Sequence, residues 1–188
     1  MTLGDKFLAI EDIALMSKMT KLGRRRGHTD RTVSLIVHLV LGVATVFWLI
    51  RANPQIFSRV PAGPRLSGLE VVFYVIGVAS IVLGYYFNHQ FVAQYAVPGG
   101  NMFWGPGSWQ QFIQLGYTNP AAASASQDYT IINVILLPLF TIVDGMRRGI
   151  RRPWLFFVSS LFTSCAFAYA FYFATVERQH RHQKAAVL

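Results

Sequence analysis

Charged residues are scarce in this chain. Asp, Glu, Lys and Arg together make up 13% of the 188 residues, whereas hydrophobic residues make up 53%. Soluble domains carry about 25% charged residues, and a chain of this length could not bury so much apolar surface in one core. The composition therefore excludes a disordered chain and an ordinary water-soluble enzyme, and it predicts an integral membrane protein.

Acidic residues and cysteine are also few. There are eight Asp and Glu residues, and those near the apolar stretches fall at their ends: Glu70, Asp128, Asp144 and Glu177. Proton pumps and ion-coupled carriers place carboxylates deep in the membrane, so this pattern argues against both classes. The single cysteine, Cys165, excludes an intrachain disulfide and a multi-cysteine metal site.

The chain contains long apolar stretches without the polar–apolar alternation that barrel strands require. Each approaches the ~20 residues that a helix needs to cross the hydrocarbon core. They predict an all-α polytopic membrane protein with four transmembrane helices, at about Val33–Ile50, Glu70–Val97, Tyr129–Gly145 and Pro153–Val176. The predicted organisation is a basic N-terminal tail at 1–32, a first helix at 33–51, a loop at 52–69, a three-helix core at 70–183 that includes a long loop at 98–128, and a tail at 184–188.

Basic residues outnumber acidic residues by 17 to eight, which gives a formal charge of +9. They gather beside the apolar stretches, at residues 18–31, 147–152 and 178–184. This placement is typical of residues that anchor helices among lipid headgroups, so we expect lipids and no nucleic acid as partners. With four spans, the side of the N-terminal tail carries about ten basic residues and the other side about seven, which does not decide the orientation.

The long loop at 98–128 contains no Lys or Arg. It carries Trp104 and Trp109, which suit the headgroup belt of a membrane. The stretch Trp109–Leu115 predicts a short interfacial helix, and Asn119 followed by Pro120 predicts the start of the third long helix. We therefore expect an ordered cap rather than a flexible linker.

Polar residues within the apolar stretches are the candidates for ligand binding. His38 shares a helix face with Ser34 and Gly42, which suits an axial ligand to chlorophyll magnesium or haem iron. The alternative is a neutral histidine that is hydrogen-bonded to a neighbouring helix. Asn88 and His89 form a polar step that marks either a helix leaving the lipid or a second part of such a site.

Two further patterns predict packing. Asp144 has basic residues at i+3 and i+4, which predicts an interfacial ion pair with Arg147 or Arg148. Small residues spaced by four allow close approach of helices in lipid, and the fourth stretch has two such rows: Ser160, Ser164 and Ala168, and Ala166, Ala170 and Ala174. One row can serve the internal bundle, and we expect the second to contact another partner.

Short motifs between Glu70 and Gln183 resemble a known family. They are Gly84-Tyr85-Tyr86-Phe87 with Gln90-Phe91, Phe112 with Asn119-Pro120-Ala121-Ala122, the turn Asp144–Arg151, Trp154-Leu155, and Phe171-Tyr172-Phe173 before Glu177-Arg178. In this order they are similar to the small bacterial and algal membrane proteins grouped as domain of unknown function 2834. The resemblance implies a three-helix core and supplies no activity. The first helix and the basic tail lie outside it.

From these features we expect a non-catalytic accessory or structural subunit of a larger membrane complex, and not an enzyme. Other membrane subunits and lipids are the expected partners. The resemblance implies a photosynthetic rather than a respiratory host, with chlorophyll or bacteriochlorophyll and carotenoid as cofactors before haem, in a bacterial inner or intracytoplasmic membrane or a thylakoid membrane. The alternative is a stand-alone small membrane enzyme or carrier with a pocket near Asn88, His89, Asn133 and Asp144.

Overall fold

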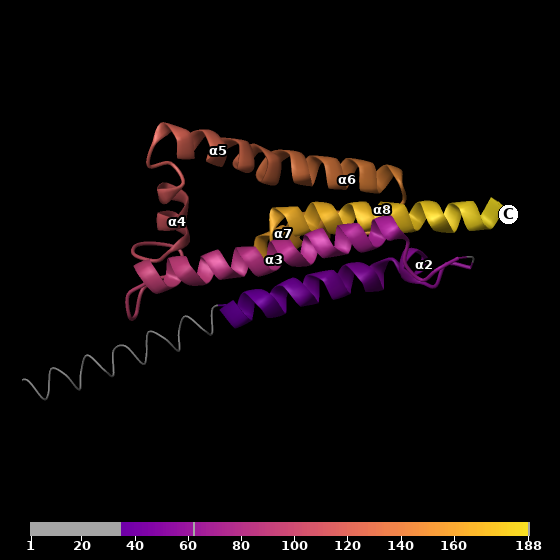
Figure 1. The fold of residues 1–188 in the computed structure, drawn as a ribbon, viewed down its shortest axis with the longest axis horizontal. Helices are drawn as coiled ribbons and strands as arrows, with labels where there is room; N and C mark the ends of the chain where they lie inside the picture. The colour runs from indigo at the N-terminus through magenta and orange to yellow at the C-terminus, as the bar shows by residue number, and fades with distance from the viewer. Residues whose placement is uncertain (1–34, 62, 188) are drawn as a thin grey trace, which may run out of the picture. The chain divides into compact units, whose positions relative to one another are not determined.

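The computed structural model describes residues 35–61 and 63–187, and within them it contains helices and no strand (Figure 1). The predicted tail at 1–32 and the residues that begin the first helix lie outside the described residues. The chain divides into two compact units. One contains Gln90–Leu115 with the described residues before Val37, and the other contains Val37–His89 and Gly116–Leu188.

Within the part of the chain that the structure describes, three helices are long and apolar enough to cross a membrane. They are Leu35–Ala52, which we call the first helix and which is indigo in Figure 1, α3 at Gly68–Tyr95, and the continuous helix Pro120–Arg147. At ~1.5 Å per residue, their 18, 28 and 28 residues span ~27 Å or more. The all-α membrane class is therefore confirmed.

The predicted fourth span is not one crossing helix. It is divided into α7 at Trp154–Phe162 and α8 at Cys165–Val187. The ring of Phe156 lies 5.6 Å from that of Phe171 and 4.9 Å from that of Tyr172, so the two helices run antiparallel on either side of the break. The count of four transmembrane helices is thus inexact: the described chain has three long apolar helices and one helical hairpin, α7–α8.

The tip of the hairpin lies at Thr163 and Ser164. Thr163 leaves the helical conformation with φ −118° and ψ −96°, and the Ser164 hydroxyl caps α8 by accepting a hydrogen bond from Phe167 N at 3.0 Å. On α3, Ser80 pairs with the Ser164 hydroxyl at 2.8 Å, and Tyr85 donates to the Phe162 carbonyl at 3.3 Å. These partners satisfy polar groups that would be costly in lipid.

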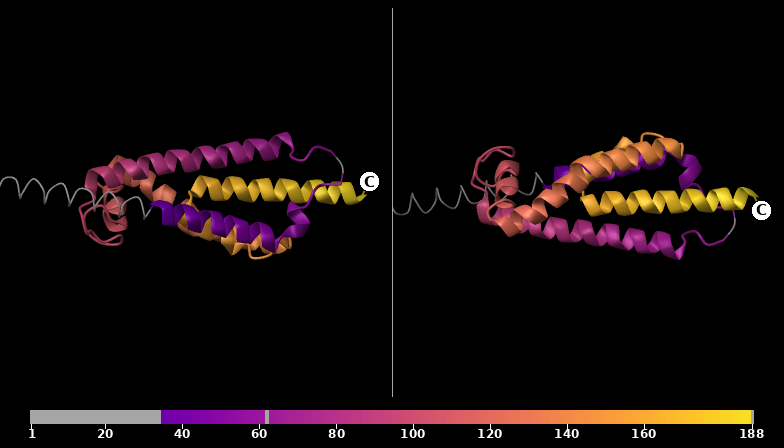
Figure 2. Two further views of the ribbon diagram at one scale, coloured as in Figure 1. Left: turned by 90° about the horizontal axis from the view of Figure 1, so that it is seen from below. Right: turned by 90° about the horizontal axis from the view of Figure 1, so that it is seen from above.

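The contacts of the tip place it at the middle of the long helices. Ser80 lies near the centre of α3, and Gly42 of the first helix approaches Thr163 so closely that a Cβ there would be 2.9 Å from its methyl carbon. On the third long helix, Leu137 packs with Cys165. In the left view of Figure 2 α8 is seen between α3 and the first helix, and in Figure 1 it is seen between α3 and α6. The hairpin therefore enters between the long helices and returns to the end from which it came.

The third long helix consists of α5 at Pro120–Thr130, the π-helical segment η1 at Ile131–Leu136 and α6 at Leu137–Arg147. Its predicted start is confirmed, because the Asn119 side chain accepts from Ala122 N at 3.0 Å and Pro120 occupies the first turn. Pro138 has no N–H and its ring crowds the preceding turn. The wider π-helical segment η1 ends directly before α6, whose first turn contains Pro138.

The loop between α3 and α5 contains the predicted short helix, α4 at Trp109–Leu115. Before it, Trp109 N donates to Met102 O at 2.9 Å, and Gly107 with φ +74° packs so tightly that a Cβ would be 2.4 Å from Ala96 Cα. Trp104 and Trp109 are 66% and 46% exposed, as headgroup-facing residues would be. That this loop caps a site near His89 stays a prediction.

Candidate functional site

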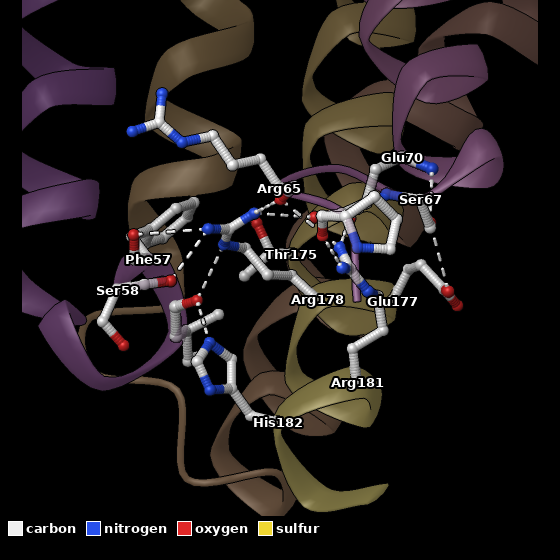
Figure 3. Close-up of polar contacts among 12 residues, drawn as sticks. Phe57, Ser58, Arg65, Ser67, Glu70, Thr175, Glu177, Arg178, Arg181 and His182 are labelled. Carbon is white, nitrogen blue, oxygen red and sulfur yellow. Dashed lines mark hydrogen bonds and ion pairs between the residues drawn. The ribbon is translucent and has the colours of Figure 1, made fainter. Parts of the chain in front are cut away.

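A capping box starts α3 and sets the position of a buried acid. Ser67 N donates to Glu70 Oε2 at 2.6 Å, and Glu70 N donates to Ser67 Oγ at 3.1 Å. This reciprocal pair satisfies two backbone donors at the helix start. It also holds the Glu70 carboxylate, whose side chain is 0% exposed, toward α8 (Figure 3).

Arg178 of α8 binds this carboxylate. Its guanidinium donates to Glu70 Oε1 at 3.0 Å. The remaining donors go to four backbone carbonyls of the loop before α3, at 2.8 to 3.5 Å: those of Ile56, Phe57, Ser58 and Arg65. A guanidinium has five N–H donors, so all of them are used, which is the condition for burying this cation without a large penalty.

The next turn of α8 extends the same contacts. Arg181 pairs with the second Glu70 oxygen and with the Pro64 carbonyl, and the His182 ring contacts Ile56 O at 3.1 Å. We call Glu70, Arg178, Arg181 and the loop carbonyls that they bind the arginine clasp. It joins the outer part of α8 to the 53–67 loop, which includes the short helix α2 at Pro54–Phe57.

A buried asparagine joins the end of the first helix to the turn before α7. Asn53 is 0% exposed, and its Nδ2 donates to Leu49 O and to Arg151 O, both at 2.9 Å. Its Oδ1 accepts from Arg151 N at 2.7 Å. One side chain therefore satisfies both backbone groups of Arg151 and fixes the two loops to each other.

The Asp144 carboxylate, near the end of α6, connects α6 to α8. Asp144 Oδ2 accepts from Arg148 Nε at 2.6 Å and from the Tyr172 hydroxyl at 2.5 Å. The predicted ion pair with Arg148 is thus confirmed, and the additional partner on α8 ties α6 to the hairpin. Arg148 also contacts the His180 ring at 3.1 Å, and Gln179 Nε2 donates to Arg148 O at 2.6 Å.

Glycines determine the shape of the turn that follows. Gly149 adopts φ +71°, its N–H donates to Met146 O, and Ile150 N donates to Gly145 O at 2.8 Å. This pair of bonds is the Schellman pattern that ends a helix at a left-handed glycine. A Cβ on Gly145 would lie 2.6 Å from Pro153 Cβ, so only glycine allows α6 and the start of α7 to approach this closely.

Together these contacts form a polar layer at one end of the second unit. Its carboxylates, Glu70, Asp144 and Glu177, each accept at least one hydrogen bond from the chain's own groups. The apolar residues beside this layer form the largest buried cluster of the described chain, which includes Leu49, Ile56, Ile150, Phe156 and Tyr172. The arrangement holds helices together, and its three carboxylates are already hydrogen-bonded within the chain.

An apolar cavity of about 320 Å³ lies beside the hairpin tip. It is bounded by the first helix, α3 and the tip, through Leu39, Gly42, Val43, Val46, Phe47, Ile50, Ile81, Tyr85, Thr163 and Phe167. The polar atoms of this lining, the Tyr85 and Thr163 hydroxyls, are already bonded to carbonyls of α7. The volume is at the lower end of that of small-molecule sites, which are usually concave and mostly apolar.

The residues predicted for a pocket do not come together. Asn88 and His89 are exposed, and His89 lies 19 residues beyond Glu70 on α3, or ~28 Å along the helix. Asp144 belongs to the polar layer at the Glu70 end. Asn133 lies in η1, where its Nδ2 contacts the Tyr129 hydroxyl at 3.4 Å. The structure therefore does not bring these four residues together at one place, and the alternative of a small enzyme or carrier stays a prediction.

His38 lies near the hairpin tip. Its ring packs edge-on against Phe162, with 6.2 Å between the centroids. Among the described residues there is no cluster of three or more His, Cys, Asp or Glu side chains that could hold a metal ion. The role of His38, Asn88 and His89 toward a pigment stays a prediction.

The small-residue rows of α7 and α8 lie mostly inside the chain. Ser160, Ala168, Ala170 and Ala174 are buried, Ser164 forms the hairpin tip, and Ala166 is exposed. The second row was expected to need another partner. Because α7 folds back, Ala170 and Ala174 of this row are buried among elements of the same chain, whereas Ala166 is exposed. Contact of this row with another subunit stays a prediction.

The arginine clasp and Asn53 were not among the predicted site residues. A local signal existed for Glu70, since Ser67-Gly68-Leu69-Glu70 has the spacing of a capping box. No local signal marks Arg178 or Asn53, because their partners lie about 100 residues away.

The fold and the polar layer define a helical membrane protein with three long apolar helices and an inserted hairpin. The chain matches the family described as "Protein of unknown function DUF2834" over residues 72–178, more than half of its length, and it belongs to this family. The match begins within α3, contains the Asp144–Arg151 turn and the hairpin tip, and ends at Arg178, while the first helix lies outside it. No curated protein and no solved structure matches the chain.

Proposed function

We propose that the protein is a non-catalytic accessory subunit of a larger membrane complex and that it holds an apolar chain molecule between its helices. The observation that carries the proposal is the cavity beside the hairpin tip, which is apolar and lies at the middle of the long helices. The polar groups of the chain are concentrated in a layer at one end, where they bind each other. This separation of the polar layer from the apolar cavity suits a structural subunit with a hydrophobic binding site.

The long helices offer surface for other subunits. Of the 28 residues of α3, only Glu70 and Gly77 are buried within the chain. Large side chains such as Val75, Val82 and Phe87 are more than half exposed. A surface of this kind faces lipid or the helices of partner subunits, and its extent on α3 supports membership of an assembly.

The lining of the cavity favours a chain-like ligand over a macrocycle. It contains no imidazole, thiol or carboxylate that could bind magnesium or iron, and His38 is not part of it. An acyl chain or a carotenoid polyene needs no such ligand. The resemblance to phototroph proteins favours a photosynthetic over a respiratory host.

Isolation from native membranes tests this function. We expect the tagged 21.1 kDa chain, extracted with mild detergent, to migrate on a native gel in a band with other membrane subunits. The absorbance spectrum of this band should show polyene or chlorophyll features if the host is photosynthetic. A chain that migrates alone in every mild detergent would contradict the proposal. If the His38→Leu variant contained one chlorophyll fewer per chain than wild type, His38 would instead be the ligand of a chlorophyll.

A further inference from the structure

We infer that the cavity binds one acyl chain of an anionic phospholipid whose phosphate group contacts Arg51. This deepens the proposed function, on which it rests, by naming the class of the bound molecule. The inference combines the direction in which the cavity runs along the first helix with the charge at its outer end.

The cavity follows one face of the first helix. Its lining positions there are 39, 42, 43, 46, 47 and 50, which repeat at the three- and four-residue spacing of a helix face. Arg51 follows Phe47 by four residues and lies one turn beyond it, at the edge of this face and outside the lining itself. From Leu39 to Arg51 the helix rises ~18 Å, close to the ~15 Å depth of one leaflet's hydrocarbon.

The hairpin tip borders the inner part of the cavity. Gly42, Thr163 and Phe167 all line it, and the absence of a Cβ on Gly42 lets the first helix approach Thr163 closely there. An acyl chain that enters from the Arg51 end would thus meet the hairpin tip at the middle of the membrane. The dimensions suit one chain of a lipid in a single leaflet.

Cationic residues follow the last lining position of the first helix, Ile50. Arg51 is exposed, and the Asn53 contacts bring the backbone of Arg151 to the end of the same helix. Arg152 lies over the Trp48 ring, 4.7 Å from its centroid. The acidic side chains of this end, Glu70, Asp144 and Glu177, are already hydrogen-bonded within the polar layer.

An apolar groove that ends at an exposed guanidinium matches an amphiphile with an anionic head. Guanidinium–phosphate hydrogen bonds are among the strong charge-assisted ones, and basic sites at helix ends select anionic lipids. A polyene would fill the groove without using Arg51. A zwitterionic lipid would gain less from a cationic site, because its own ammonium group opposes the attraction.

Lipid retention by the full-length chain tests the inference. The purified protein is incubated with equimolar phosphatidylglycerol and phosphatidylcholine of the same acyl chains, and bound lipid is counted by native mass spectrometry. We expect wild type to retain one phosphatidylglycerol in preference to phosphatidylcholine. Arg51→Gln should reduce this retention about tenfold, and Arg51→Lys should restore part of it.

Two further variants separate the parts of the site. Arg59→Gln removes an exposed arginine from the loop after α2 and should leave retention unchanged. Val43→Phe adds volume to the cavity lining from a position that is 62% exposed, so it should reduce retention of both lipids without a core clash. Equal retention of the two lipids, an Arg51→Gln value equal to that of Arg59→Gln, or full retention in Val43→Phe would each overturn the inference.

The native gel of the same samples keeps this test separate from the proposed function. A chain that remains in its complex but shows no lipid preference would remove the phospholipid and leave the accessory role intact. A chain that binds the lipid as expected but migrates alone would keep the phospholipid site and remove the accessory role.

Discussion

Replacing Arg178 with Met should destabilise the folded protein by about 3 kcal/mol. The substitution keeps most of the apolar stem but removes the cation, so Glu70 would retain only Arg181 as a charged partner. It would also leave buried loop carbonyls, among them those of Ile56 and Ser58, without donors. Removing one member of a buried pair costs more than the pair itself contributes, because the remaining charge is left desolvated.

The free energy of unfolding in detergent micelles, followed by circular dichroism, measures this effect. Arg147→Met, at an exposed position of the same end, is the matched control and should change the stability by less than about 0.5 kcal/mol. The double variant Glu70→Gln with Arg178→Met should recover part of the loss, since the orphaned charge is then absent. If Arg178→Met and Arg147→Met were equally stable, the arginine clasp would not contribute to folding.

Asn53→Leu should lower the free energy of unfolding by about 3 kcal/mol as well, although no charge is involved. Leucine has nearly the same shape, but it satisfies neither the N–H nor the C=O of Arg151, nor the Leu49 carbonyl. An unsatisfied buried polar group costs about 1 to 3 kcal/mol, and two or more would be left. The destabilised part would be the junction between the first helix and the Asp144–Arg151 turn.

Thermal unfolding of Asn53→Leu beside Gln55→Leu tests this junction. Gln55 is exposed two residues further along, so its replacement changes hydrophobicity without removing a buried partner. Protease digestion should then cut the 58–66 loop faster in Asn53→Leu than in wild type. Identical melting of both variants would show that the Asn53 contacts are dispensable.

Local signals in the sequence predicted local structure well. Asn119 and Pro120 predicted the start of α5, and Trp109–Leu115 forms the predicted short helix. The spacing of Asp144 and Arg148 predicted their ion pair. In each case the partners lie within a few residues of one another, so the chain's own periodicity contains the information.

The hairpin could not be predicted by hydropathy. Residues 153–176 are apolar throughout, and an average over such a window gives the same value for one crossing helix as for two antiparallel pieces. The relevant signal is the pair Thr163-Ser164, whose hydroxyls bond to Ser159 O and Phe167 N and so end one helix and start the next. Ser164 was interpreted as a small packing residue, a role that the same composition fits equally well.

The hairpin also changes the expected sidedness of the chain. Because α8 returns to the end from which α7 began, the C-terminal segment lies on the side of the 53–67 loop and the Asp144–Arg151 turn. This side then carries ten Lys and Arg residues, counted from Arg51 to Lys184, against seven in the N-terminal tail. The four-span interpretation placed more basic residues on the side of the N-terminal tail, and the hairpin places more on the other side. The positive-inside rule therefore favours the side where α7 begins and α8 ends as the inner side.

Cysteine accessibility from the two sides of the membrane tests the hairpin most directly. In a Cys165→Ala background, single cysteines replace Lys184 in α8, Arg59 in the loop before α3 and Ala121 at the start of α5. An impermeant thiol reagent should label Lys184→Cys and Arg59→Cys from the same side and Ala121→Cys from the opposite side. If Lys184→Cys were labelled together with Ala121→Cys, α7 and α8 would form a complete fourth span and the hairpin would be contradicted.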